Sequence, residues 1–138
     1  MDLEPLLRAS PAIQGHVATV LPAFAIGTWS LFLSPKGSAS HRWGGRAFVA
    51  LMATTAITTA FIRAVVGPAL AIGSLRFGLI HLFIPLTAHG LWQGLGAIRR
   101  GDVPGHARAM RRLYLGALVI AGVFTFAPGR ILYRVVMG

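Results

Sequence analysis

Histidine is the main source of acid–base and ligand chemistry in this chain, which has five histidines, three acidic residues and no cysteine. The acids are Asp2, Glu4 and Asp102, too few for paired-carboxylate catalysis or a carboxylate metal cage. The lack of cysteine excludes disulfides, thiolate zinc sites and iron–sulfur clusters. No serine lies in a nucleophile elbow. We therefore expect neither hydrolase nor transferase activity.

His16 and His81 could together hold a haem. Each lies four residues after the start of an apolar segment, and the two segments run parallel if the chain crosses a membrane four times. The two imidazoles would then lie at the same depth, as the two axial ligands of a b-type haem must. The alternative is that each histidine forms a hydrogen bond with a backbone carbonyl or a lipid headgroup. His89, deeper in the third segment, is expected to bond a threonine of the second segment or to relay protons.

Two further histidines, His41 and His106, lie beside arginines at the starts of the second and fourth segments. Basic side chains at a membrane surface bind phosphate, anionic headgroups or an acidic partner. The other interpretation is a pair of solvated histidines in ordinary basic loops. Asp102 is well placed to cap the fourth helix and to neutralise Arg99, Arg100 or Arg108. The predicted headgroup or partner contacts are His41, Arg42, Arg46, His106, Arg108, Arg111 and Arg112.

The elements that position these residues are apolar and long. Hydrophobic residues make up 55% of the 138-residue chain, charged residues only 12%, and the mean hydropathy is +0.70. So little polar surface cannot coat a soluble globule of this size. The sequence therefore predicts one all-α domain over 1–138, a polytopic bundle of four transmembrane helices at 12–33, 43–66, 77–98 and 106–128. Gly67-Pro68 is expected to end the second helix, and Pro85 to kink the third.

The basic residues predict the orientation in the membrane. The formal net charge is +10, but the basic residues form short clusters between apolar segments, so we do not expect nucleic-acid binding. The loops after the first and third helices, with their flanks, contain Lys36, Arg42, Arg46, Arg99, Arg100, Arg108, Arg111 and Arg112. The opposite side contains Arg8, Arg63, Arg76, Arg130 and Arg134. This excess places the first group in the cytoplasm and both termini in the periplasm of a bacterial inner membrane.

Small and hydroxylated residues would hold these helices together. Small residues four positions apart, as at Gly90 and Gly94, allow the backbones of two helices to approach closely. Ala23 with Gly27 and Ala117 with Ala121 repeat the spacing in the first and fourth helices. The second helix has threonines whose hydroxyls can bond their own backbone or a neighbouring helix: Thr54, Thr55, Thr58 and Thr59.

Two segments carry a family resemblance. His41–Val49 has the pattern HRxxGRxxV, and Gly101–Met110 has the pattern GDxxxHxRxM, each at the start of a predicted helix. Together they resemble a bacterial family of small four-helix predicted membrane proteins, a domain of unknown function. The resemblance extends from about Gln14 to Ala117, and implies the fold and topology but no activity. The His-Ala-Arg-Ala-Met sequence departs from a denser His-Arg-Arg-Trp-Met expected at 106–110.

Three functions are compatible with these residues. The favoured hypothesis is a non-catalytic accessory or interaction subunit of a larger membrane complex, in contact with anionic lipid and other membrane subunits. The second is a small b-type haem electron carrier using His16 and His81. The third, a proton or ion conduit, is weakest because the predicted spans contain no acid and the chain has no inverted repeat.

Overall fold

The computed structural model describes residues 3–62, 70–72 and 75–137. These residues are mainly helical, with one short antiparallel hairpin between β1 (Leu70–Ile72) and β2 (Leu75–Phe77), in which Leu70 pairs with Phe77. The helices are α1 (Glu4–Leu7), α2 (Pro11–Thr28), η1 (Trp29–Leu33), α3 (Ala39–Ala60), η2 (Leu79–Leu82), α4 (Phe83–Arg99), α5 (Val103–Leu113), η3 (Tyr114–Ile120), α6 (Ala121–Thr125) and α7 (Ile131–Met137).

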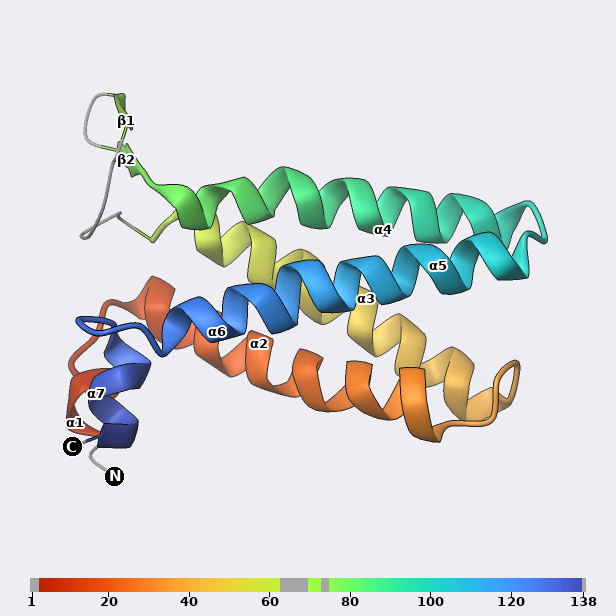
Figure 1. Cartoon of the computed structure of the whole chain (residues 1–138), viewed down its shortest axis with the longest axis horizontal. Coiled ribbons are helices and arrows are strands. Elements are labelled where there is room, and N and C mark those ends of the chain that lie inside the picture. The colour runs from red at the N-terminus through yellow and green to blue at the C-terminus, as the bar shows by residue number, and fades with distance from the viewer. Residues whose placement is uncertain (1–2, 63–69, 73–74, 138) are drawn as a thin grey trace.

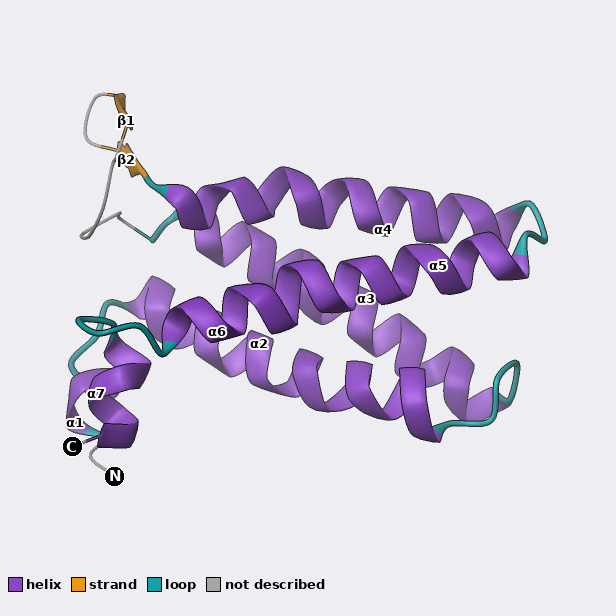
Figure 2. Ribbon diagram, viewed as in Figure 1, coloured by secondary structure: helices purple, strands orange, loops and turns teal. Residues whose placement is uncertain are grey.

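Four long helical segments lie side by side (Figure 1). They are α2 with η1, α3, α4, and the continuous α5–η3–α6, and Figure 2 shows loops only at their ends. The α2–α3 and α4–α5 connections lie at one end of the bundle, whereas α1, α7 and both termini lie at the other. Helix α2 packs mainly on α3, and α4 mainly on α5.

The first long segment extends over Pro11–Leu33, where the sequence predicts a helix at 12–33. It begins with proline, whose fixed φ suits the first helical position, and it ends in a π-helical turn over Trp29–Leu33. Among the described residues, this is the one helix that is both long and apolar enough to cross a membrane by length and composition alone, with a mean hydropathy of 1.5 over its most apolar window.

The second segment begins earlier than the predicted 43–66. Helix α3 starts at Ala39 because the Ser38 hydroxyl accepts a hydrogen bond from the backbone N–H of His41, which caps the helix. The helix ends at Ala60, and the predicted break at Gly67-Pro68, together with Arg63, lies outside the described residues.

The predicted start of the third helix at 77 is wrong. Phe77 belongs to β2, a 3-10 turn follows over Leu79–Leu82, and α4 begins only at Phe83. Pro85 therefore lies in the first turn of α4, not at a mid-helix kink. The first four N–H groups of a helix have no intrahelical partner, so proline is tolerated at this position.

A tight connection joins α4 to α5. Gly101 has a φ of +74°, a backbone conformation that glycine adopts without strain. The N–H of Asp102 donates to Ala97 O and that of Gly101 to Ile98 O, which together form a Schellman motif. Asp102 then caps the next helix by accepting the Gly105 N–H at 2.8 Å, as the sequence predicts. Backbone groups at the end of α4 and at the start of α5 thus find hydrogen-bond partners within a few residues.

The fourth segment is continuous over Val103–Thr125, against a predicted 106–128. Its central part, Tyr114–Ile120, is π-helical. Among the described residues, the only other π-helical stretch is Trp29–Leu33. The Tyr114 hydroxyl reaches α2 next to that stretch and lies 2.6 Å from the Thr28 hydroxyl.

Close packing at small residues forms the core. Ala23 is fully buried and Met52 is 1% exposed, and they lie in one cluster with Phe48, Leu113 and Tyr114. Gly90 faces Leu113, and Gly94 faces Met110, so the predicted small-residue face of α4 packs on α5. The predicted threonine bonds also form, since Thr55 donates to Thr19 across to α2 while Thr59 donates to its own helix.

Candidate functional site

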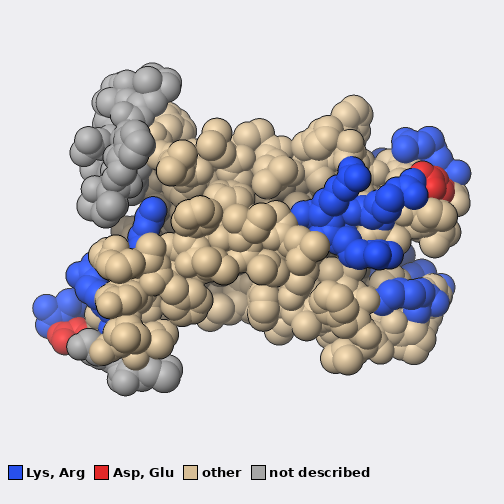
Figure 3. Space-filling view, viewed as in Figure 1, with Lys and Arg blue, Asp and Glu red and all other residues tan. Residues whose placement is uncertain are grey.

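Positive charge gathers at the end of the bundle that carries the two helix connections (Figure 3). The middle of the face shown there has no charged side chain. Within the described residues, Asp102 is the one acid at this end, and α1 and α7 at the opposite end contribute Arg8 and Arg134. The basic residues near the two connections are Lys36, Arg42, Arg46, Arg99, Arg100, Arg108, Arg111 and Arg112.

His41 links the start of α3 to the end of the first segment. The single hydroxyl hydrogen of Ser34 is donated to Ser30 O at 3.0 Å, so Ser34 accepts the Nδ1–H of His41 at 2.8 Å. His41 lies outside the predicted span 43–66, and burial lowers its pKa below the ordinary 6.5. The charge of Lys36 and the nearby His106 lower this pKa further, and a hydrogen bond to Ser30 opposes them. His41 is therefore neutral at pH 7 and donates inward.

Three other basic residues near this connection also have local partners: Lys36 in the loop, and Arg42 and Arg46 in the first turns of α3. The Lys36 ammonium donates to Ser30 O at 2.6 Å and to Leu31 O at 2.8 Å, which satisfies carbonyls at the end of the first segment. Arg42 donates to Gly37 O at 2.8 Å. The Arg46 guanidinium lies 5.0 Å from the Trp43 ring centroid, a cation–π contact. Much of the positive charge at this connection thus makes contacts within the connection and the start of α3.

His106 of α5 forms a hydrogen bond with the backbone of α4. Because a carbonyl can only accept, the Nδ1–H of His106 donates to Gly94 O, at 2.9 Å. This bond lies where Gly94 lets the two helices approach. The structure therefore brings His41 and His106 near one another, as the sequence predicts for a shared face, and gives each an internal hydrogen bond.

A pocket of about 210 Å³ lies between the end of α4 and the start of α5. Three arginines line it, Arg100, Arg108 and Arg112, together with Gln93. We call this the arginine pocket. Asp102 also lines it, but the predicted neutralisation of an arginine by Asp102 is wrong: among the described residues the only salt bridge joins Arg8 to Glu4. The three arginines that line the pocket therefore have no acidic partner within 4.0 Å among the described residues.

Sequence reasoning missed Arg100 and Gln93 as site residues. Gln93, Ala97 and Arg100 are spaced by four and three positions and so lie on one face of α4. Residues 105, 108, 109 and 112 have the matching spacing on α5. The spacing identifies the two faces. Which faces meet depends on the connection at Gly101 and Asp102, which only the structure shows.

The structure gives His16 and His81 separate partners. The Thr59 hydroxyl donates to Thr55 O at 2.7 Å and so accepts the Nδ1–H of His16 at 3.1 Å. His81 is buried, and its Nδ1 lies 3.0 Å from the backbone nitrogen of Gly78 and 3.3 Å from Gly78 O. Within the described part of the chain, no ring contact joins the two histidines.

His89 points away from the core, and the predicted bond to a threonine of the second segment does not form. The ring is exposed and lies 6.4 Å from the Trp92 ring centroid. The inward face of α4 carries Thr87, Leu91 and Gly94, and position 89 is about 200° from position 87 at ~100° per residue. The buried polar group of α4 is therefore Thr87, which is 4% exposed.

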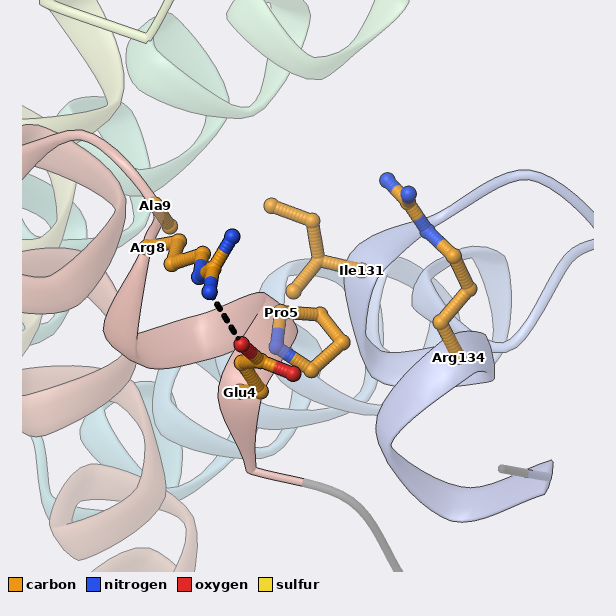
Figure 4. A pocket seen from close by; sticks show the side chains of 6 residues that line it. All are labelled: Glu4, Pro5, Arg8, Ala9, Ile131 and Arg134. Carbon is orange, nitrogen blue, oxygen red and sulfur yellow. Dashed lines mark ion pairs between the residues drawn. The ribbon is translucent and has the colours of Figure 1, made fainter.

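A second pocket, of about 420 Å³, lies at the opposite end of the bundle. Figure 4 shows that α1 contributes Glu4, Pro5 and Arg8, while α7 contributes Ile131 and Arg134. Glu4 and Arg8 form an i,i+4 ion pair on α1 with largely exposed side chains. A solvated pair of this kind contributes little to stability.

A helical chain with basic ends and an apolar middle is typical of a membrane protein. The chain belongs to the family described as predicted membrane protein (DUF2306), which it matches over residues 13–137. The family resemblance seen in the sequence is thereby confirmed, and contact with membrane lipid follows from it. No curated protein and no solved structure matches the chain.

Proposed function

We propose that this chain is a four-span protein of the bacterial inner membrane that serves as a non-catalytic accessory or interaction subunit. The observation that carries the proposal is the charge-free middle of the face seen in Figure 3, which is bounded by basic ends. Such a surface is costly in water and suits a hydrocarbon layer.

Large apolar side chains are exposed on each of the four long segments. Phe24 of α2, Ile57 of α3, Leu86 of α4 and Leu115 of η3 are all between 45% and 61% exposed. The segment Pro11–Leu33 has 23 residues, a length of about 34 Å at ~1.5 Å per residue, which spans a hydrocarbon core of ~30 Å. Lipid contact on every segment supports four crossings.

The orientation follows from the basic residues. Both helix connections lie at the end with the denser positive charge, so the positive-inside rule places them in the cytoplasm. Both termini lie at the other end and would face the periplasm. The exposed Trp43, beside Arg46, suits the headgroup level of the cytoplasmic face.

An interaction role is favoured because several interior polar side chains form hydrogen bonds with one another between segments. Thr19 pairs with Thr55, His16 with Thr59, and Thr28 with Tyr114. These bonds hold the helices together without presenting a reactive group to a substrate. The surface, in contrast, presents Trp92 at 75% exposure and a set of exposed arginines. Surface chemistry of this kind suits a partner subunit and anionic lipid.

Native electrophoresis of the full chain tests the interaction role. Membranes from the native host are solubilised in a mild detergent, and the chain is detected by an epitope after Gly138. We expect it to migrate within an assembly that contains another membrane protein, identified from the same band. Migration only as the free chain or its own oligomer would contradict an accessory role.

A further inference from the structure

We propose that the arginine pocket binds a phosphate group, supplied in the membrane by the headgroup of an anionic phospholipid. The proposal deepens the proposed function and rests on it, because that function places this end of α4 and α5 at the cytoplasmic membrane surface. It also narrows the predicted headgroup contacts to one defined place in the fold.

The donor set of the arginine pocket is suited to phosphate. Arg100 comes from the end of α4, and Arg108 and Arg112 lie one turn apart on α5. Guanidinium groups bind phosphate oxygens through paired N–H donors. Gln93 adds an amide from the α4 side. The Asp102 carboxylate already accepts the Gly105 N–H, and no arginine of the described chain lies within 4.0 Å of it.

Small residues form the base of the arginine pocket. Ala97 and Ala109 line it and are 4% and 7% exposed. Their short side chains leave a hollow between the helices where larger ones would fill it. Arg100 folds back along α4, since its Nη1 would lie 3.1 Å from a Cβ placed on Gly96. The volume of about 210 Å³ is below that of sites for drug-sized ligands and suits a single headgroup.

The surroundings favour a lipid over free phosphate as the source of this group. Trp92 precedes Gln93 and is 75% exposed, and indole rings of this kind lie at headgroup level. Ile98 and Val103 flank the connection and are 43% and 59% exposed, which provides an apolar surface for acyl chains. Basic pockets between helices at the cytoplasmic side bind anionic headgroups.

Native mass spectrometry of the full chain in detergent tests the proposal. The probes are phosphatidylglycerol, phosphatidylcholine and inorganic phosphate. The pocket variant is Arg100→Gln/Arg108→Gln/Arg112→Gln. The matched control is Arg42→Gln/Arg99→Gln/Arg111→Gln, which removes the same charge from the same end outside the pocket. A thermal melt of both variants checks that each is folded.

We expect wild type to bind phosphatidylglycerol at least about tenfold more tightly than phosphatidylcholine, since each basic residue near anionic lipid contributes roughly fivefold. The pocket variant should lose at least about tenfold more affinity than the control, because it also removes paired hydrogen bonds. Equal losses in the two variants, or no preference for the anionic lipid, would overturn the proposal.

Inorganic phosphate separates the two sources of the phosphate group. If millimolar phosphate displaces phosphatidylglycerol completely and binds as tightly as the lipid does, the lipid assignment is wrong and a soluble anion occupies the pocket. The lipid measurement does not depend on the number of membrane crossings or on partner subunits. Its failure is therefore distinguishable from failure of the proposed function.

Discussion

Replacing Gly27 with leucine is expected to destabilise the bundle strongly, because Gly27 lies at a close contact between helices. A Cβ at Gly27 would lie 2.7 Å from Cε2 of Phe48 and 3.0 Å from Cδ2 of Tyr114. Both rings are buried in the core and cannot swing aside as a flexible chain end can. Overpacking of this kind costs about 1–3 kcal/mol and occasionally more. Unfolding in mixed micelles, followed by tryptophan fluorescence, measures the loss.

Gly122 provides the matched control. It is also a helical glycine, in α6, and a Cβ there would meet nothing within 4 Å. Gly122→Leu should leave stability unchanged or raise it by up to about 1 kcal/mol through helix propensity. Equal destabilisation by the two substitutions would show that Gly27 is not a contact between helices.

Tyr114→Ala is the second large effect that we expect. The ring is 4% exposed and lies 5.8 Å from the Phe24 centroid and 6.0 Å from that of Phe32. The Thr28 hydroxyl donates its hydrogen to Phe24 O, so Tyr114 must donate to Thr28, at 2.6 Å. Removing a buried aromatic ring costs about 3–5 kcal/mol. A melt of the purified protein in detergent measures this loss.

Tyr114→Phe separates the ring from its hydroxyl. Phenylalanine keeps the stacking and removes only the bond to Thr28, so the expected cost is about 0.5–1.5 kcal/mol. If Tyr114→Phe were as damaging as Tyr114→Ala, the hydrogen bond and not packing would hold α2 to the fourth segment. That result would contradict the packing account of the core.

The sequence predicts well those features of the fold that depend on neighbouring residues of one helix. Apolar length predicts the four long segments, and the position of Asp102 before Val103-Pro104-Gly105 predicts a cap. The small residues at Gly90 and Gly94 predict a contact face. Each feature depends on residues within a few turns of one helix, so periodicity and composition suffice.

Features that depend on which helix faces meet could not be predicted. Depth alone pairs His16 with His81, but His16 bonds Thr59 because α2 packs mainly on α3. The inward face of α4 carries Thr87, Leu91 and Gly94 because α4 packs there on α5 and α3. His89 consequently points outward.

The candidate site shows the same division. A cluster of positive charge at the two helix connections is visible in the sequence. The sequence does not show which basic side chains already form hydrogen bonds within the chain. Lys36 donates to carbonyls of its own segment, and His41 donates to Ser34. The arginine pocket depends on the turn at Gly101, whose positive φ sets α5 against α4.

Accessibility of single cysteines from the two sides of the membrane tests the four-span topology most directly. The chain has no cysteine, so each introduced thiol reports one position. Leu7→Cys and Met137→Cys lie at the end with the termini, and Ser40→Cys and Val103→Cys lie at the end with the two connections. All four positions are exposed.

In intact cells with a permeable outer membrane, a maleimide that cannot cross the inner membrane should label Leu7→Cys and Met137→Cys. Ser40→Cys and Val103→Cys should react only after the inner membrane is opened. Labelling of all four from one side, or of Ser40→Cys and Val103→Cys from opposite sides, would contradict the four-span account.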